Sequence, residues 1–459
     1  METITGDTFD SRWKLHTSRV SRENKETEET VREIIAAVRA EGDEALIRYG
    51  KKFDRSSPLK VEIPGNAAEE AWRKLSRDEA DLSAALTLAA EHIRRFSEEQ
   101  RRQFKDFEYS MGEGLVTGQR VVPLSRAAIY VPAGRFPLIS TVLMGLVPAM
   151  TAGTGELLLV SPPLEDGMPD RRILGAAWIA GSVCNSKAIL RFFAMGGAQA
   201  IAALALGTES VPRCDIIAGP GNKYVAAAKR QLYGEVGIDF VAGPTDVLII
   251  ADKKTANAET IAADMIAQAE HDADARARAL VPDRETADSI SAAVEKRLSF
   301  LSTANPALAS LDAGGLMVLY RDREEAIRIA NTIAPEHLEL QLEDPDQWIP
   351  SLVNYGSLFI GSLSAEVLGD YSAGVNHTLP TSGSARFTGG LSVRHFLKTL
   401  TSLRCERGRT FELARKSAET IAKAEGLEAH AQSAALRSEA FENAALRSAL
   451  SREETHGIC

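Results

Sequence analysis

The sequence predicts a parallel α/β protein, and three observations support this fold class. Short β-rich runs, AAIYVPAG, ELLLVSPP, KAILRFFAMGG, CDIIAGPGN and DVLIIAD, begin after Arg126. Ala-rich segments with apolar residues at helical spacing separate these runs, and strands that alternate with helices are typical of parallel sheets. The chain has 459 residues, roughly three times the length of an average domain, so we expect more than one hydrophobic core.

Four regions follow from these patterns. Residues 1–125 are predicted to be mainly helical, because apolar side chains between residues 25 and 107 recur at helical spacing, as in Val31, Ile34, Ile35 and Val38. Residues 126–245 form the first α/β domain. Residues 246–385 form a second one, where NAETIAADMIAQAE reads as an amphipathic helix before the strand-like runs RARALVPD and GLMVLYRD. Residues 386–459 are predicted to be a helical extension, and no internal repeat is evident.

Composition excludes several classes of protein. Hydrophobic residues make up 44% and charged residues 25%, as in an ordinary globular protein, and the net charge of −10 disfavours nucleic acid as a partner. The most apolar stretch, residues 141–153, is shorter than the ~20 residues of a membrane-spanning helix. The N-terminal METITGDTFDSRWK lacks the pattern of a signal peptide, so we expect a cytoplasmic protein. Four cysteines without a CxxC pair indicate neither a disulfide framework nor a thiolate zinc site.

Two short motifs carry candidate ligands and bases. In MIAQAEHDAD, Gln268 and His271 stand at i and i+3 near the end of a predicted helix, so both can project toward one metal ion. Alternatively, His271 could hydrogen-bond to the last carbonyl groups of the helix. For these two residues taken alone, that interpretation is favoured. In TIAPEHLEL, the adjacent Glu336 and His337 can supply a base and its orienting partner. An adjacent Glu and His on a solvent-exposed turn without a function would have the same sequence.

Residues 334–394 are rich in Gly, Ser, Thr, Asn and Pro, which predicts functional loops. Within them, LGDYSAGVNHTLPTSGSAR offers Asp370 as a metal ligand and His377 as a hydrogen-bonding group for a polar substrate. Further on, AEGLEAH places Glu425 and His430 five residues apart, about 140° apart on a regular helix. Either Gly426 interrupts that helix or only one of the two side chains points into a site.

Two glycine-containing turns could accept a phosphate group. GPGNKY follows the strand-like CDIIA and precedes a helical run, and MGGAQA occupies a similar position earlier in the chain. Glycines at such a turn allow a ligand to approach backbone N–H groups at the helix start. Neither motif is GxGxxG, and each alone is compatible with a simple strand-to-helix turn, so a dinucleotide site is suggested only.

Eight motifs, taken together, give the chain a family resemblance. IYVPAG, GGAQAIAALA, GPGNKYV, AGPTDVLIIAD, QAEHD, APEHLEL, GDYSAGVNHTLPT and EGLEAH occur in the order and nearly the spacing of the histidinol dehydrogenases, which the sequence resembles over roughly residues 30–440. The resemblance implies two Rossmann-like domains and a C-terminal extension that is exchanged between the subunits of a homodimer. It also implies oxidation of L-histidinol to L-histidine through histidinaldehyde, with two NAD and one Zn²⁺ per subunit, in histidine biosynthesis.

The same resemblance implies roles for individual residues. Zinc would be held by Gln268, His271, Asp370 and His430. His337 would take the alcohol proton, and Glu336 would activate the water that attacks the aldehyde. The substrate would touch the zinc ligands and His337, together with Thr245, Glu366, His377 and Glu425, and NAD would touch Tyr130, Gln199 and Asn222. Glu425 and His430 would act on the partner subunit's site.

Departures from the family pattern leave alternatives open. The usual AGPSE reads AGPTD, with Thr245 and Asp246, and Ala365 stands where Pro is usual. Related zinc dehydrogenases of other polar alcohols, such as sulfopropanediol dehydrogenases, share the metal motifs, although a sulfonate would need cations where Glu366, Tyr371 and Glu425 stand. A zinc hydrolase could use the same ligands with Glu336 as base. The α/β run before the metal motifs and the lack of an HExxH motif oppose a hydrolase. A catalytically inactive binding protein is disfavoured, because every residue to which a chemical role is given above is present.

Overall fold

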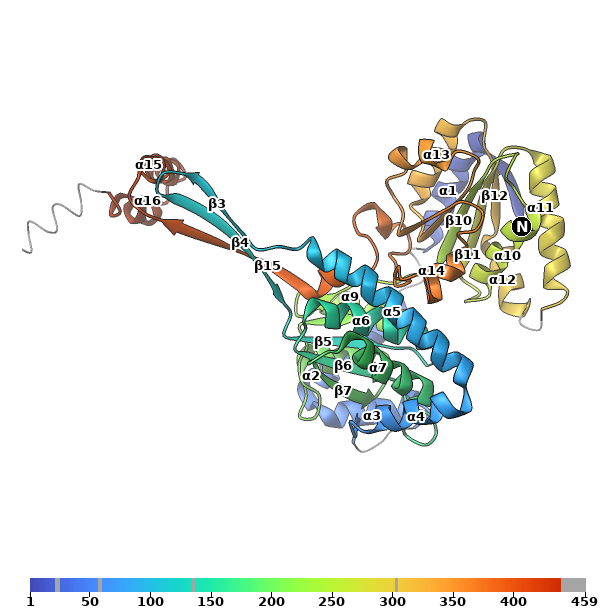
Figure 1. Ribbon diagram of the computed structural model, residues 1–459, viewed down its shortest axis with the longest axis horizontal. Coiled ribbons are helices and arrows are strands. Elements are labelled where there is room, and N and C mark those ends of the chain that lie inside the picture. Colours follow the sequence, from blue (N-terminus) through green and yellow to red (C-terminus); the bar gives the residue numbers. More distant parts are fainter. Residues whose placement is uncertain (21–24, 57–59, 134–136, 302–303, 439–459) are drawn as a thin grey trace, which may run out of the picture. The chain divides into compact units, whose positions relative to one another are not determined.

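The computed structural model describes residues 1–20, 25–56, 60–133, 137–301 and 304–438 (Figure 1). The chain divides into two compact units. Unit 1 comprises Met1–Arg102 with Pro123–Leu397, and unit 2 comprises Gln103–Val122 with Lys398–Cys459. Among the helices of the described residues, none has the length and apolar character needed to cross a membrane.

Unit 1 contains a first six-stranded sheet of order β2-β7-β6-β5-β8-β9. Its strands are parallel except for β2, which runs antiparallel to β7. Their bounds are β2 Glu62–Ile63, β5 Arg126–Tyr130, β6 Glu156–Ser161, β7 Ile189–Ala194, β8 Ile216–Ala218 and β9 Gly237–Ile238. One face packs on α4 Ala67–Asp78, α5 Ala80–Arg102, α6 Ile139–Ala152 and α7 Arg171–Cys184. The other packs on α2 Lys25–Glu41, α3 Asp43–Phe53, α8 Gly197–Leu206 and α9 Lys223–Leu232.

A second six-stranded sheet in unit 1 is parallel throughout, with the order β1-β12-β11-β10-β13-β14. Its strands are β1 Glu2–Thr5, β10 Asp246–Ala251, β11 Arg276–Val281, β12 Leu316–Leu319, β13 His337–Gln341 and β14 Ser357–Ile360. Helices α10 Ala258–Ala269, α11 Arg284–Leu298 and α12 Ala304–Gly314 cover one face, and α1 Gly6–Val20 and α13 Arg323–Ile333 cover the other. The five strands β5–β9 and the five strands β10–β14 have the same spatial order, although the sequence shows no repeat. The predicted parallel α/β fold is thus confirmed.

Unit 2 is built on a three-stranded sheet of order β15-β4-β3, with α15 Arg409–Ala424 and α16 Glu428–Ala435. The strands are β3 Phe107–Gly112, β4 Leu115–Pro123 and β15 Leu397–Cys405. Its core is small: the buried residues among those described are Gly118, Val121, Ala422 and Ala431.

Four segments differ from the expectation of helices and loops. Residues 107–123 form the β3–β4 hairpin, because Phe107, Tyr109 and Met111 alternate with polar residues and Gly112 and Gly114 adopt positive φ at the turn. Residues 2–5 form β1 and join the second sheet, and residues 397–405 form β15. Residues 334–394, expected to be loops, contain β13, β14, the short helix α14 Glu366–Tyr371 and four 3₁₀ turns, Pro345–Gln347, Ile349–Ser351, Ser384–Arg386 and Val393–Phe396.

Candidate active site

The candidate catalytic residues gather at the amino-terminal edge of the second sheet. Thr245 immediately precedes β10, and Glu336 precedes β13, which begins at His337. Strands β10 and β13 are parallel neighbours in which Val247 pairs with His337, so both strands start at the same edge. The end of α10 and the helix α14 bring Gln268, Glu366 and Asp370 to this edge.

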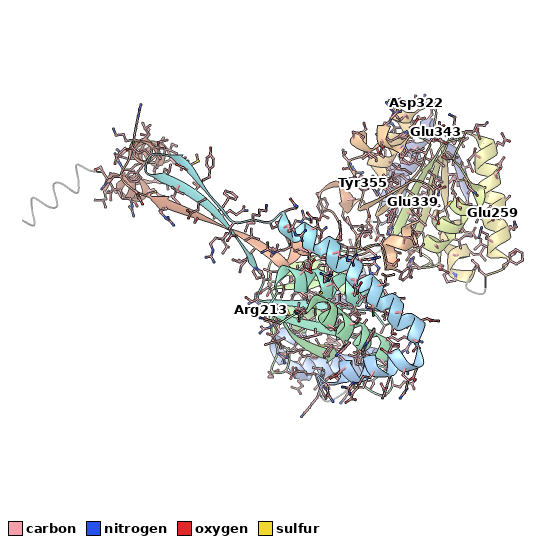
Figure 2. All side chains as sticks on the ribbon, viewed as in Figure 1. Arg213, Glu259, Asp322, Glu339, Glu343 and Tyr355 are labelled. Atoms are coloured by element: carbon pink, nitrogen blue, oxygen red, sulfur yellow. The ribbon has the colours of Figure 1, made fainter. Side chains whose placement is uncertain are left out.

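Strand β13 has two chemically different faces. Leu338 and Leu340 belong to the apolar core beneath α1 and α13, whereas His337, Glu339 and Gln341 point to the opposite face. All five residues are buried. Figure 2 labels Glu339 within this sheet. A buried strand with three polar side chains on one face is unusual, because such groups are costly to bury unless they are paired or functional.

Glu336 is buried and held by two neighbours on β10. Its Oε2 lies 2.5 Å from Thr245 Oγ1 and accepts a hydrogen bond from the Asp246 N–H at 3.1 Å. Burial raises the pKa of Glu336 to about 7, against the opposing effects of His337 and the Thr245 hydroxyl. A carboxyl group with this pKa can both accept and release a proton near neutral pH.

His337 faces three acidic side chains. Its Nδ1 lies 3.2 Å from the Asp246 carbonyl oxygen and 3.8 Å from Glu366 Oε2, and its Nε2 lies 3.4 Å from Asp370 Oδ1. Burial alone would lower the pKa of His337, but the negative charges of Glu336, Glu366 and Asp370 outweigh it and hold that pKa well above its usual value. The imidazole is therefore poised to hold a proton in this environment.

Three of the four expected metal ligands lie in unit 1. The Gln268 amide is buried between Thr245 and Glu366; oriented so that both ends find partners, its nitrogen donates to the two Glu366 oxygens at 3.0 and 3.1 Å and its oxygen lies 2.6 Å from Thr245 Oγ1. His271 Nε2 is 4.0 Å from Asp370 Oδ2. Helix α10 ends at Ala269, so His271 follows the helix rather than lying on its face, which differs from the expected i, i+3 arrangement. In the described part of the chain, no three His, Cys, Asp or Glu side chains form a group at metal-binding spacing.

His377 is fixed between two parts of unit 1. Its Nδ1 lies 2.9 Å from the Asp370 carbonyl oxygen, and its Nε2 lies 3.2 Å from Thr141 Oγ1 on α6. Burial lowers the pKa of His377, so the neutral ring is favoured. His377 therefore joins the end of α14 to the first α/β region.

Glu425 and His430 belong to unit 2, where both side chains are exposed. Helix α15 ends at Ala424, Gly426 has φ +74°, and α16 starts at Glu428. Of the two alternatives considered for this motif, the interruption at Gly426 is therefore the one observed.

The three expected NAD contacts lie at the carboxyl-terminal edge of the first sheet. Tyr130 ends β5, and its hydroxyl oxygen accepts from the Gly197 N–H at 3.1 Å at the start of α8; burial raises the pKa of Tyr130 to about 12. Gln199 is buried in the first turn of α8, whereas Asn222 is exposed and caps α9 by accepting from Tyr224 N and Val225 N. Strands β5 and β8 are parallel neighbours, but the chain adds β6 and β7 on one side of β5 and then β8 and β9 on the other; ligands of open α/β sheets bind at the point where the strand order reverses in this way.

Several polar residues around the site escaped prediction. Glu339 accepts from the Glu366 N–H at 2.8 Å, at the start of α14. Burial, together with the negative charge of nearby Asp264 on α10, raises the pKa of Glu339 to about 8. Arg278 on β11 forms a buried ion pair with Asp246. Each of these residues lies in a strand that also contains apolar residues: Glu339 in HLELQ, Arg278 in RARALV and Asp246 in DVLIIA. A charged residue in such a strand was the signal that could have revealed them.

Comparisons with known proteins identify the family of this chain. The family model for histidinol dehydrogenase matches residues 17–438. The chain is 48% identical over 411 residues to a histidinol dehydrogenase of Thermus thermophilus, covering 89% of this chain and 94% of the relative, and 43% identical over 415 residues to one of Aquifex aeolicus, covering 90% and 93%. The crystal structure of histidinol dehydrogenase from Elizabethkingia anophelis superposes with a TM-score of 0.82 at 34% identity, covering 89% and 91%. The chain therefore belongs to the histidinol dehydrogenase family of NAD-dependent oxidoreductases.

Proposed function

We propose that this site oxidises L-histidinol to L-histidine through histidinaldehyde, using two NAD per turnover and one Zn²⁺ per subunit. The observation that carries the proposal is the adjacent pair Glu336 and His337, two buried proton-transfer groups at one strand start. A four-electron oxidation has two stages, and each stage releases a proton at the same carbon centre. Two neighbouring bases suit that requirement better than one.

Gln268, His271 and Asp370, with His430, would hold the zinc ion. Imidazole, carboxylate and amide oxygen are suitable zinc ligands, and atoms bound to one ion at about 2.1 Å lie about 3 to 4 Å apart. The 4.0 Å between His271 Nε2 and Asp370 Oδ2 is within that range. When bound, the metal would orient the substrate's nitrogen atoms and favour ionisation of its hydroxyl group.

His337 would act in the first stage. It takes the hydroxyl proton while hydride leaves the carbinol carbon for NAD, which gives the aldehyde. With a cation bound to Asp370, that carboxylate would stabilise the protonated imidazole less, which would favour the neutral, basic form of His337. Glu366, 3.8 Å from His337 Nδ1, provides an acidic wall for a cationic amino or imidazole group.

Glu336 would act in the second stage. It removes a proton from water as the oxygen attacks the aldehyde carbon, while His337 returns the proton from the first stage to the aldehyde oxygen; the product is a hydrate and His337 is again a base. A second hydride then leaves for a second NAD while His337 accepts the hydroxyl proton, leaving the carboxylic acid. The Glu336 pKa of about 7 matches a base that must be regenerated in each cycle near neutral pH.

We further propose that Tyr130, Gln199 and Asn222 contact NAD. They come from the ends of β5 and the starts of α8 and α9, where backbone N–H groups at helix starts favour a phosphate. Gly219 has φ +113°, and a Cβ there would lie 2.1 Å from the Tyr130 carbonyl oxygen, so only glycine allows this turn to pass so close to β5.

Glu425 and His430 would complete the site of the partner subunit in a homodimer. Both are exposed in their own unit, whose core is small. Unit 1 leaves Leu363 90% exposed, Phe387 82% and Tyr371 53%, and unit 2 leaves Leu413 61% and Ile421 55% exposed. Exposed apolar side chains of this size are available for contact with a protein partner. A cytoplasmic location remains our prediction.

The site favours histidinol over a sulfonated diol, because carboxyl groups such as Glu366 can pair with an amino or imidazole cation, whereas a sulfonate would need cations at those positions. The test is an NAD-reduction assay with L-histidinol, L-histidinaldehyde and sulfopropanediol, with and without a zinc chelator. We expect two NADH per histidinol, and loss of this activity after chelation. NADH only from the sulfonated diol would move the substrate to that alternative, and the absence of NADH from all three would overturn the dehydrogenase proposal.

A further inference from the structure

Asp246 makes two hydrogen bonds with Glu336. The Asp246 backbone N–H donates to Glu336 Oε2 at 3.1 Å, and the Asp246 Oδ1 accepts from the Glu336 backbone N–H at 3.0 Å. These two bonds form a closed ring between the starts of β10 and β13. The Asp246 side chain therefore holds the Glu336 backbone, from which the carboxylate projects, and the Asp246 N–H holds the carboxylate itself.

Arg278 sets the orientation of the Asp246 side chain. Its Nη1 donates to the second oxygen, Asp246 Oδ2, at 2.8 Å, and the two side chains are only 6% and 9% exposed. Arg278 lies on β11, two residues beyond the position that pairs with Asp246, and its guanidinium carbon is 5.2 Å from the centre of the Trp13 ring on α1. With one oxygen bound to Arg278, the other is directed at the Glu336 N–H.

We propose that Asp246 and Arg278 are positioning residues for Glu336, and so support the water-dependent second stage of the reaction more than the first. This inference rests on the proposed role of Glu336. The physical reason is that Arg278 does not touch the reacting carbon but keeps the carboxylate that activates water in place, and a displacement of about 1 Å at such a group can cost about 100-fold in rate.

The first experiment compares Arg278→Met with wild type as the full-length, zinc-loaded protein. The first NADH formed from histidinol is followed by stopped flow, and steady-state oxidation of histidinaldehyde is measured separately. We expect oxidation of the aldehyde to fall about 10- to 100-fold, with the first NADH and the KM for histidinol changed less than about 3-fold. Equal slowing of both stages, or no slowing of either, would overturn the proposal.

Further variants separate positioning from general damage. Arg276→Met is the matched control and should leave both stages unchanged, because Arg276 is the register partner of Asp246 on β11 but its side chain donates to the Ala275 carbonyl oxygen and is not part of the Arg278–Asp246 ion pair. Arg278→Lys should restore part of the lost aldehyde activity, and it decides the question if Arg278→Met does not fold. Adding Arg278→Met to Glu336→Gln should slow aldehyde oxidation no further, because both act through one carboxylate; a multiplicative loss would refute the coupling. Two NADH per histidinol from wild type tests the proposed function separately.

Discussion

Replacing Lys229 by Met should destabilise the protein strongly, because Lys229 is one half of a buried clamp on the turn at Gly219. Lys229 is 1% exposed; its Nζ donates to the Gly219 carbonyl oxygen at 3.0 Å and also to Asp239 Oδ1. Asp239 Oδ2 in turn accepts from the Gly219 N–H at 2.8 Å. Both ends of one glycine residue are thus held by a single ion pair.

Met fills a similar volume but leaves the Asp239 carboxylate buried without its cation. Loss of one partner of a buried pair costs about 3–5 kcal/mol, and each kcal/mol lowers the Tm of a domain of this size by about 2–4 °C, so we expect the Tm to fall by about 6–20 °C. The turn leads to Asn222, so the KM for NAD should rise while the KM for histidinol stays constant. Thermal unfolding and initial rates measure these effects.

Two controls test the reasoning. The double variant Lys229→Met with Asp239→Leu removes both charges and should recover most of the lost Tm. Lys296→Met breaks an exposed pair with Glu259, whose partners are 65% and 46% exposed, and should cost less than about 1 kcal/mol. The explanation would be refuted if Lys229→Met cost no more than Lys296→Met, or if the double variant were less stable than the single one.

Three further outcomes are expected. Chelation should abolish NADH formation and added Zn²⁺ should restore it, whereas activity that survives exhaustive chelation would contradict a zinc requirement. Glu336→Gln should slow conversion of aldehyde to acid more than conversion of alcohol to aldehyde, and equal slowing would contradict its role. Burial and Asp264 raise the pKa of Glu339 to about 8, so the folded state favours the neutral form of this group. The contribution of Glu339 to the free energy of unfolding is therefore present at low pH. It is lost as the pH rises from about 4.5 to about 8, by at most about 5 kcal/mol. The variant Glu339→Gln should flatten this dependence in melts between pH 5 and 9, and an unchanged slope would refute the assignment.

Much of the fold could be predicted because its signal is local. The central strands are apolar runs bounded by turn residues, as in DVLIIA, and they read directly as buried parallel strands. The hairpin at residues 107–123 was missed, because exposed aromatic residues in alternation follow a long helix without an apolar run. The pairing of β1 with β12 joins segments more than 300 residues apart, and periodicity contains no information about such a partner.

The candidate site residues could be named from the sequence, but the contacts between them could not. Glu336 and His337 were identified as a possible pair from their adjacency. The structure places His337 3.4 Å from Asp370, and Glu336 beside Thr245, which also contacts Gln268. The position of His271 beyond the helix depends on where α10 ends, which sequence patterns give only within a few residues. The contact of Arg278 with Asp246 joins two strands, and this requires knowledge of the sheet order.

The alternating faces of β13 limit how this protein can evolve. A substitution in the strand changes one side chain, but an insertion or deletion of a single residue would shift all those that follow to the opposite side of the sheet. Such a change would turn Glu339 and Gln341 into the apolar layer under α13 and bring Leu338 and Leu340 toward α10. We therefore expect the length of this strand to tolerate far less variation than its composition, and substrate range to change through surrounding segments instead.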